Sequence, residues 1–315
     1  MSSASALDVG AVAERERPRL VALAYRLLGT LADAEDVVQE TLLRWARLDD
    51  DERARIENPQ AWLTRVAGRV GLDHLTSARA RRELYVGPWL PEPLPAGAPG
   101  AGASSGVGGA HHAPGLAPTP APDPLDAAAT AEQVSTALLV VLETTTPAER
   151  VAFVLHDVFA VPFDEIAELL GRSPAATRQL ATSARRRVDS ARTVAVPRAE
   201  HDAVVAAFAA AAQSGDLAAL VRVLDPSVTA RSDGGGVVSA ARKPVAGAER
   251  VARFVLGILE KQPDARVEPV ATADGLAFSL HLGGTVTGVL NVGVAEGRVA
   301  ELWIAMNPAK LGAWA

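Results

Sequence analysis

Hydrophobic positions near the start of the chain repeat with the period of an α-helix. Apolar residues stand at i, i+3, i+4 and i+7 from Leu20 to Leu27, and again, after a glycine-threonine break, from Val38 to Trp45. A third run begins at Asn58-Pro59, a cap residue followed by proline at the first helical position, and continues to residue 83. Residues 1–87 are therefore predicted to form an all-α domain.

The pattern disappears between residues 88 and 124. This segment consists largely of proline, glycine and alanine without periodic apolar positions, so burial cannot repay the entropy of ordering it. We therefore expect a flexible linker, with a stretched length of about 120–130 Å.

Helical periodicity returns in residues 125–193. One helix is predicted over 127–142, and another begins at the cap Thr146 and ends before Pro162. Two further helices follow, 163–170 and one capped by Ser173, with Gly171 supplying the turn between them. Two helices joined by a tight glycine turn form a helix-turn-helix unit.

The last part, residues 199–315, has a mixed pattern. Residues 201–236 are expected to form a long helix, a short helix entered through Gly215-Asp216 and a strand, and residues 245–260 a further helix. Four strand-like runs separated by glycine-containing turns fill 265–306. Helices packed on a curved antiparallel sheet form an α+β cone. The predicted fold class is thus multidomain: two all-α domains followed by an α+β domain.

Composition narrows the classes of function. The 315 residues include no cysteine, are 49% hydrophobic and carry a net charge of −6. We find no signal-like start and no apolar run near eighteen residues, so we expect a soluble cytoplasmic protein without membrane contacts. The negative charge argues against a uniformly basic coat, and nucleic-acid contacts must come from local clusters.

One such cluster lies on the final helix of the helix-turn-helix unit. A stripe of Leu180, Ala184 and Val188 is expected to pack inward, whereas Arg178 and Arg185 lie on roughly the opposite side. A helix with an apolar back and a basic front is typical of a recognition helix in the major groove. A surface helix with a solvated basic end is the alternative.

Three segments carry a family resemblance: LLGTLADAEDVVQETLLRWAR, NPQAWLTRVAGRVGLDHLTSARARRE and VPFDEIAELLGRSPAATRQLATSARRRV. They resemble regions two and four of bacterial sigma factors of the extracytoplasmic function (ECF) group, in order and in spacing. The resemblance implies that the acidic second helix binds the β′ clamp helices of core RNA polymerase, with the β flap as a further contact. The implied residues, supported by Trp45, are Asp33, Asp36, Gln39, Glu40 and Leu43. From the residues alone, a solvated acidic face is the alternative.

The same resemblance divides promoter DNA between the two helical domains. The third helix would hold the displaced strand of the downstream element, through Asn58, Trp62, Arg65, Arg69, Arg79 and Arg82. Core packing is the alternative for Trp62. Region four would read the upstream element as duplex, through Ser173, Thr177, Arg178, Gln179, Thr182, Arg185, Arg186 and Arg187. The two elements lie about 70 Å apart, a distance that the stretched linker can span.

The α+β part resembles the SnoaL-like domain of the nuclear transport factor two superfamily. Three motifs, WLPEP, DGGG and NPAKL, look like the signatures of ECF sigma factors with a fused SnoaL-like extension, which is implicated in controlling the sigma factor in cis. The implied residues are Trp89, Pro91, Glu92, Pro93, Asp233, Gly234, Gly235, Gly236, Asn307, Pro308, Lys310 and Leu311. The chain departs from the subgroup at Val237 and Ala309, which puts polar contacts there in doubt.

Motifs for catalysis are missing from the sequence. Asp233, Asp274 and His281 are the obvious acid-base candidates of the extension, without a Ser-His-Asp order, an HExxH motif, a phosphate loop or metal-ligand spacing. We expect no enzyme activity, no cofactor and no metal, and instead a small apolar ligand in the cone.

The leading interpretation is a sigma factor that binds core RNA polymerase and directs it to promoters, with the extension modulating it in cis. Two alternatives stay open: a ligand-responsive helix-turn-helix regulator that does not bind core polymerase, and a SnoaL-like cyclase or isomerase fused to a DNA-binding domain. The acidic first domain and the long linker favour the sigma factor, because a repressor needs neither.

Overall fold

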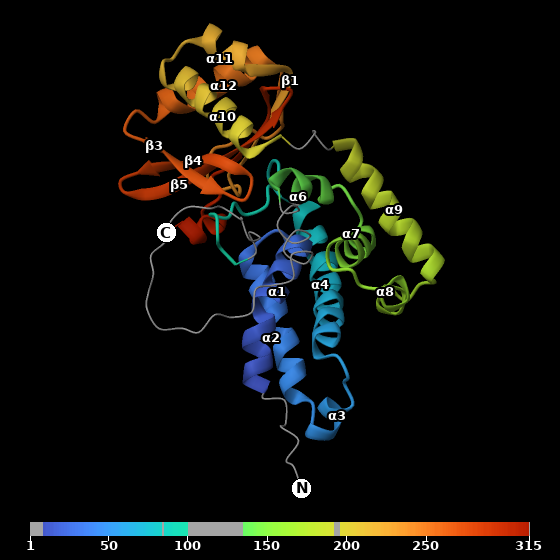
Figure 1. Cartoon of the computed structure of the whole chain (residues 1–315). Helices are drawn as coiled ribbons and strands as arrows, with labels where there is room; N and C mark the ends of the chain where they lie inside the picture. Colours follow the sequence, from blue (N-terminus) through green and yellow to red (C-terminus); the bar gives the residue numbers. More distant parts are fainter. Residues whose placement is uncertain (1–8, 84, 100–134, 192–195, 315) are drawn as a thin grey trace.

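Two helical bodies and one α+β body follow one another along the chain (Figure 1). The structure is a computed structural model that describes residues 9–83, 85–99, 135–191 and 196–314, without the side chains of 79–83 and 191. The α+β body lies at one end of the two helical bodies, the end where α6 is found (Figure 1).

The first body confirms the predicted helices and adds a short one. Gly29, with φ of 78°, ends the first helix, and the Thr30 side chain caps the second by accepting a hydrogen bond from the Asp33 amide. The buried stripe includes Leu20, Leu27 and Trp45 as expected. The helices are α1 (Val9–Leu28), α2 (Leu31–Arg47), α3 (Asp50–Ala54) and α4 (Pro59–Glu83). The sequence analysis did not predict α3.

The second body contains the predicted helix-turn-helix unit. Gly171 adopts the left-handed conformation, with φ of 62°, and ends the helix before the turn. Thr146 and Glu149 form the expected capping box. The elements are α6 (Thr136–Leu142), α7 (Pro147–Phe153), the π-helix η1 (Val154–Val158), α8 (Phe163–Leu170) and α9 (Pro174–Ala191). Residues 127–134 of the predicted first helix lie outside the described residues.

The two helical bodies share one hydrophobic core. Helix α4 lies between α1 and α2 on one side and α7 and α8 on the other (Figure 1). At Gly68 the approach is so close that an added Cβ would lie 2.9 Å from Leu155 Cδ1 and 3.1 Å from Leu169 Cδ1. The buried Arg150 guanidinium also crosses the interface and donates to the Leu27 carbonyl at 2.8 Å. In this structure the bodies expected to sit on separate promoter elements are therefore packed together.

The α+β body has helices on one side of a six-stranded sheet. Its helices are α10 (Arg198–Gln213), α11 (Leu217–Val223) and α12 (Ala248–Lys261), followed by the 3-10 turns η2 (Pro308–Lys310) and η3 (Gly312–Trp314). The strands are β1 (Leu224–Asp233), β2 (Val245–Ala246), β3 (Arg266–Thr272), β4 (Gly275–Leu282), β5 (Thr285–Ala295) and β6 (Arg298–Ala305), in the spatial order β2-β1-β6-β5-β4-β3.

The sheet differs from the expected all-antiparallel arrangement at one pair. Strands β3 to β6 form the predicted meander, but β1 pairs with β6 in parallel, with Asp233 opposite Ala305. Strand β1 precedes the meander in sequence and joins it beside the last strand rather than the first. As a consequence, the chain beyond Asp233 and the chain beyond Ala305 leave the sheet side by side.

The first part of the predicted linker is ordered. Leu90, Glu92 and Leu94 are each at most 5% exposed, so the expectation of a flexible segment is wrong for residues 88–99. The prediction considered only burial within the segment itself, whereas residues 90–94 are buried against the first helical body and the α+β body. Residues 100–124 lie outside the described part of the chain.

A search of the described residues finds no helix with the length and hydropathy needed to cross a bilayer.

Substitution of Gly68 tests the closed packing of the helical bodies. If α4 meets η1 and α8 in solution, Gly68→Leu overpacks the interface and lowers the free energy of unfolding by about 1–3 kcal/mol. If the bodies are separate, the same change raises it by about 1 kcal/mol, because leucine favours a helix over glycine. The measurement is urea unfolding, with Thr76→Leu on the exposed face of α4 as the matched control.

Candidate functional site

The acidic surface predicted on α2 faces solvent. Asp36 and Gln39 are exposed, and Leu43 beside them is 48% exposed, which is unusual for a leucine in this chain. Glu40 forms an ion pair with Arg44 at 2.5 Å. Trp45 lies on the other side of the helix and is fully buried, so it supports this surface only from the core. Carboxylates around an exposed leucine suit a partner with basic and apolar groups.

The face of α4 that is predicted to bind the displaced DNA strand is in contact with the second body. Arg69 Nη1 donates to the Leu169 carbonyl of α8 at 2.6 Å, and Arg65 Nε lies 3.5 Å from Glu165 Oε2. Trp62 is half-buried and packs on the Trp45 ring, with the centroids 5.4 Å apart. Arg65 and Arg69 therefore both contact the second body, although Arg69 is exposed and the Arg65 side chain is 42% exposed.

Of the other residues predicted on this face, the structure describes the side chain of Asn58 but not those of Arg79 and Arg82. Asn58 is exposed at the start of α4, where its Oδ1 accepts the Ala61 amide hydrogen at 3.0 Å. The side chains of Arg79 and Arg82 lie outside those that the structure describes.

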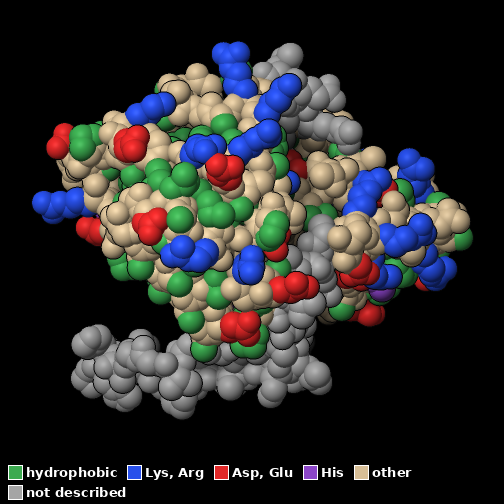
Figure 2. Space-filling model, turned by 90° about the horizontal axis from the view of Figure 1, so that it is seen from above, with side chains coloured by type: hydrophobic (Ala, Val, Ile, Leu, Met, Phe, Trp, Pro, Cys, Tyr) green, Lys and Arg blue, Asp and Glu red, His purple; other side chains and the backbone are tan. Residues whose placement is uncertain are grey.

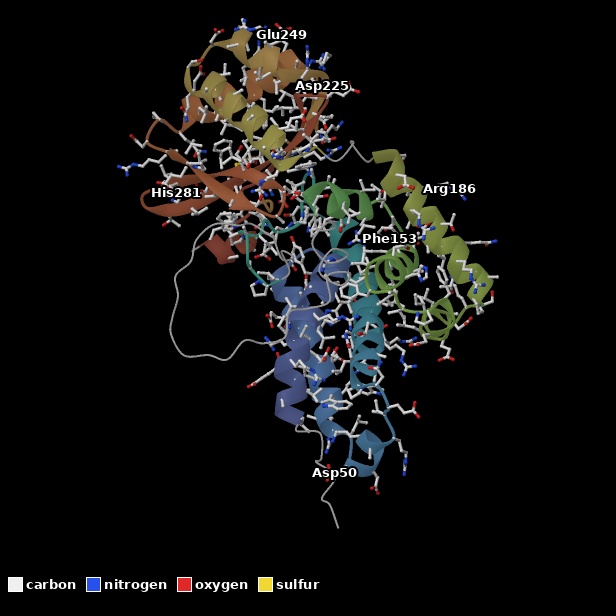
Figure 3. All side chains as sticks on the ribbon, viewed as in Figure 1. Asp50, Phe153, Arg186, Asp225, Glu249 and His281 are labelled. Carbon is white, nitrogen blue, oxygen red and sulfur yellow. The ribbon has the colours of Figure 1, made fainter. Side chains whose placement is uncertain are left out.

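Helix α9, the predicted recognition helix, presents most of its predicted residues outward. Arg178, Gln179, Thr182 and Arg186 are exposed, and Arg186 points away from the rest of the molecule (Figure 3). Blue side chains gather over this lobe when it is seen from above (Figure 2). Thr177 requires a correction, because it is fully buried and its hydroxyl donates to the Ser173 carbonyl at 3.1 Å. It faces the core and not a DNA groove.

Contacts from neighbouring elements hold two arginines of α9. The Arg178 guanidinium lies over the Phe163 ring, 5.5 Å from its centroid, and His156 stacks on the same ring at 3.7 Å. Arg185 forms two hydrogen bonds to the Asp157 carboxylate, one of them at 2.9 Å. His156 and Asp157 both belong to the π-helix η1, so this irregular turn fixes part of the basic surface.

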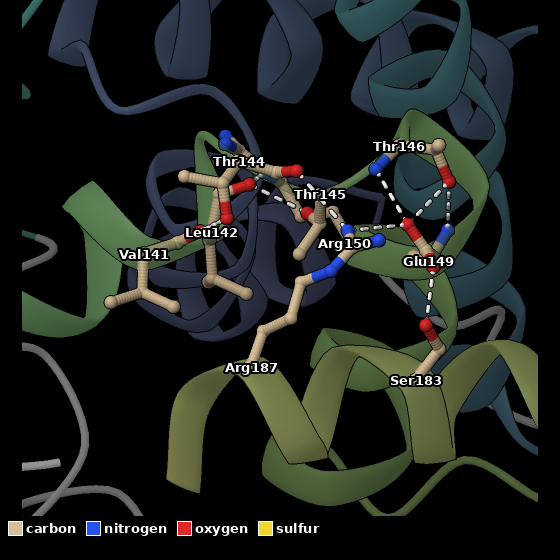
Figure 4. A network of polar contacts seen from close by, with 9 residues as sticks. All are labelled: Val141, Leu142, Thr144, Thr145, Thr146, Glu149, Arg150, Ser183 and Arg187. Carbon is tan, nitrogen blue, oxygen red and sulfur yellow. Dashed lines mark hydrogen bonds and ion pairs between the residues drawn. The ribbon is translucent and has the colours of Figure 1, made fainter. Parts of the chain in front are cut away.

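Glu149 connects α7 to α9 (Figure 4). Its carboxylate accepts hydrogen bonds from Ser183 Oγ at 2.6 Å and from Arg187 Nη1 at 3.0 Å. Burial pushes the pKa of Glu149 upward, but the hydrogen bonds from Ser183 and Thr146 outweigh this effect and the net shift of the pKa is downward. Arg187 is therefore bound within region four, and a phosphate would have to share it.

A buried ion pair joins the DGGG and NPAKL motifs. Lys310 Nζ lies 2.7 Å from Asp233 Oδ2, and the two residues are 4% and 1% exposed. The parallel pairing of β1 with β6 brings them together, because both motifs leave the sheet at the same end. Glycine is needed beside the pair, since a Cβ at Gly235 would lie 2.5 Å from Asn307 Cγ.

The WLPEP motif supplies further contacts to both residues of this ion pair. Lys310 Nζ donates to the Leu90 carbonyl, and the Leu90 amide donates to Asp233 Oδ2 at 3.0 Å. The Trp89 ring lies 4.0 Å from Lys310 Nζ, and Trp314 Nε1 donates to the Pro93 carbonyl at 2.7 Å. We call this set of contacts, from residues 85–94 to Asp233, Asn307, Lys310 and Trp314, the linker clamp.

The other side of the WLPEP motif is attached to region two. Glu92 Oε2 accepts the Leu31 amide hydrogen at 2.7 Å, the Glu92 amide donates to the Gly29 carbonyl at 2.8 Å, and Tyr25 donates to the Glu92 carbonyl at 2.6 Å. Burial raises the pKa of the Glu92 carboxyl, opposed by its hydrogen bond from Leu31. The linker clamp therefore ties the extension to region two.

The extension also holds region four. Asp274, in the turn between β3 and β4, accepts hydrogen bonds from the Thr136 amide at 2.8 Å and from the Thr136 hydroxyl at 2.5 Å. Asn291 of β5 donates to the same hydroxyl at 3.0 Å. Asp274 thus lies at the N-terminus of α6, where a carboxylate is favourable. Burial raises its pKa, against the opposing effect of the Thr136 hydrogen bonds.

The acid-base candidates of the extension do not form one site. Asp233 binds Lys310, Asp274 binds Thr136, and His281 Nε2 is 2.9 Å from Ser279 Oγ on the same strand. Within the described residues no group of three or more histidine, aspartate or glutamate side chains could hold a metal.

Several residues of these junctions were not found by the sequence analysis. Tyr85 donates to Asp233 Oδ1, and Asn307 Nδ2 donates to the Tyr85 hydroxyl at 2.9 Å. Thr136 and Asn291 connect region four to the extension. The tyrosine lies four residues before WLPEP, so extending that motif backward to the nearest aromatic would have included it.

The linker clamp can be tested by removing its positive charge. Lys310→Met leaves the Asp233 carboxylate buried without its cation, which should lower the free energy of unfolding by about 3–5 kcal/mol. The measurement is urea unfolding of the full chain, with Lys261→Met at the exposed end of α12 as control. Equal stability of the two variants would contradict the buried pair.

The contribution of the Asp274 junction to the stability of the chain should depend on pH. Because its carboxyl binds a proton to a higher pH in the folded chain than in the unfolded chain, its stabilisation is complete below about pH 4 and declines as the pH rises through the raised pKa. Asp274→Asn removes this decline, so the variant should gain stability relative to the unmodified chain as the pH rises. Thermal unfolding between pH 4 and 8 measures it, with exposed Asp264→Asn as control. If the unmodified chain and Asp274→Asn show parallel profiles of stability against pH, the raised pKa of Asp274 is contradicted.

Comparisons with known proteins agree with this architecture. Residues 12–81 match the family model for Sigma-70 region 2, and residues 135–188 match that for Sigma-70, region 4. The chain is 40% identical over 309 residues to the ECF RNA polymerase sigma factor SigJ of Mycobacterium tuberculosis H37Rv, covering 94% of this chain and 91% of that protein. It is 34% identical over 307 residues to the probable ECF RNA polymerase sigma factor SigI of the CDC 1551 strain, covering 96% and 94%.

A solved structure shows the same fold over nearly the whole length. The crystal structure of Mycobacterium tuberculosis SigJ matches with a TM-score of 0.71 at 38% identity, covering 95% of this chain and 97% of that one. Helical regions two and four followed by a SnoaL-like domain therefore confirm the expected fold class. The chain belongs to the ECF family of RNA polymerase sigma factors, the proteins that act in transcription initiation.

Proposed function

We propose that this sigma factor binds core RNA polymerase through α2 and directs it to promoters once regions two and four separate, and that its extension holds the closed arrangement until then. The observation that carries the proposal is a difference in existing contacts with the rest of the chain. Asp36, Gln39 and Leu43 are exposed, whereas Arg65 and Arg69 are in contact with α8. A polymerase could therefore bind the closed chain, but a melted promoter strand would have to compete with α8 for both arginines.

The polymerase contact is proposed to be the β′ clamp helices, with Asp33 and Glu40 completing the surface around Asp36, Gln39 and Leu43. Complementary charge would accelerate the encounter, and the exposed leucine would supply apolar contact at its centre. Region four would meet the β flap. Both assignments come from the family resemblance, and the solvent exposure of α2 supports the first of them.

The promoter contacts are proposed to form after opening. On α4, Asn58, Trp62, Arg65 and Arg69 would meet the single strand, together with Arg79 and Arg82. On α9, Arg178 and Gln179 have the exposure and the hydrogen-bonding groups for base edges, and Arg185 and Arg186 suit phosphates. The Phe163 ring would keep Arg178 oriented on the groove side of the helix.

Control by the extension is proposed to work through two attachments. The linker clamp holds region two through Glu92, and Asp274 holds region four through Thr136. While both are made, regions two and four cannot move apart, because each is fixed to the same sheet. Breaking either attachment would free one region to reach its promoter element. Sigma factors as a family are not enzymes, and we infer that the extension likewise acts by contact rather than by catalysis.

Run-off transcription with core polymerase tests this function. Product should appear only when the chain is added, and Asp36→Arg should reduce it about tenfold or more, because the change places a like charge against a basic partner. Glu260→Arg, an equal charge change on exposed α12, should leave product unchanged. If core polymerase yields no product at any promoter selected from genomic fragments, with either the purified chain or Lys310→Met, which breaks the linker clamp, the proposal is wrong.

A further inference from the structure

An apolar cavity lies inside the extension, between its helices and its sheet. It has a volume of about 110 Å³ and does not overlap the linker clamp or the Asp274 junction. Its walls come from α10, α12 and strands β3 to β6. Residues from each of the main walls are Phe208, Ala212, Ile258, Phe278, Val289 and Met306.

The chemistry of the walls defines what the cavity can hold. No charged residue lines it, and its polar lining residues are Gln213 and Ser279. The Ser279 hydroxyl is already engaged by the Glu268 carbonyl and by His281 Nε2 at 2.9 Å. A charged or strongly polar molecule would lose its hydration here without compensation, whereas an apolar molecule would gain. Cavities of about 150 Å³ with such walls stay dry and take up benzene.

The cavity has a route to solvent at β3. Val267 lines the cavity and is also 36% exposed, so the wall at this strand is thin. Strand β3 is the edge strand of the sheet, opposite the edge formed by β2. A small molecule could therefore enter at β3 without disturbing the strands that carry the linker clamp.

The opposite wall is continuous with the linker clamp. Ile304 and Met306 line the cavity near the end of β6, and the next residues along the chain begin the NPAKL motif. The Met306 amide donates to the Asp233 carbonyl at 2.7 Å. Met306 is closely packed, since a Cβ added at Gly288 would lie only 3.3 Å from its Cγ. A shift of Met306 would thus be passed to the main chain of Asp233 and Asn307.

We propose that this cavity binds a compact, uncharged apolar molecule of about six or seven non-hydrogen atoms, the size of benzene or toluene. A bound molecule shifts Met306, and this shift is transmitted to the Asp233–Lys310 pair that holds the linker. Binding itself is independent of the proposed function, whereas its consequence for promoter opening rests on that function.

Toluene is the probe for binding, added to the full chain and followed by saturation-transfer NMR. Toluene should bind the unmodified chain, and benzoate, its charged analogue, should not. Ala212→Leu fills the cavity and should weaken toluene binding about tenfold or more. The matched control is Ala210→Leu, on the exposed side of the same helix. Equal toluene affinity in the two variants overturns the site.

Further measurements distinguish variants that bind less toluene because the cavity is filled from variants that bind less because the fold is disrupted. Ala209→Leu narrows the same cavity from a half-buried position and should also weaken toluene binding, with a melting temperature close to that of the unmodified chain. If toluene binds only variants that have begun to unfold, the proposal is overturned. If gel filtration shows that the cavity variants lose a dimer, the cavity mouth belongs to an interface between two copies, and the ligand site is also overturned.

Hydrogen exchange at the Leu90 amide tests the transmission. This amide donates to Asp233 Oδ2, so a shift of the pair should change its exchange rate. Toluene should change that rate about threefold or more in the unmodified chain and in Ala210→Leu, but not in Ala212→Leu. Toluene binding without a change at Leu90 overturns the transmission. A chain that binds toluene but fails the run-off test contradicts the proposed function and leaves the site intact.

Discussion

The closed arrangement depends on one buried ion pair, Asp233 with Lys310. Both side chains are removed from water, so each charge requires the other, and the remaining hydrogen-bonding capacity is satisfied by the linker at Leu90 and Tyr85. Such a pair is a weak source of net stability, but it is highly specific, because any displacement leaves an uncompensated charge. Its energetic role is therefore to select one position of the linker relative to the sheet.

From this pair the constraint spreads to both helical bodies. The linker that it holds is bonded on its other side to the turn between α1 and α2, and the same sheet reaches region four through Asp274 and Thr136. Regions two and four are then close enough to share a core in which Arg69 and Arg150 cross the interface. The surface proposed to bind polymerase stays exposed on α2, whereas Arg65 and Arg69 of the proposed promoter surface contact α8.

Each junction contains a titratable group in an unusual environment. The carboxyls of Glu92 and Asp274 both have raised pKa values because of burial, and each accepts a backbone hydrogen bond at the start of a helix. Both attachments therefore combine favourable helix-end electrostatics with unfavourable desolvation. Because these contributions oppose one another, each reduces the free energy of its attachment, and under the proposal a polymerase contact or a ligand in the cone overcomes the remainder.

The sequence by itself determined the local elements and the family. Helical periodicity, the Thr146 capping box and the left-handed Gly171 gave the helix-turn-helix unit, and the motifs identified the ECF subgroup, because these features act over a few residues. Tertiary structure alone decided that β1 pairs with β6 in parallel, that residues 90–94 are buried, that Thr177 points inward and that Arg69 contacts α8. Each of these depends on contacts between residues far apart in the chain, whose energies no local pattern encodes.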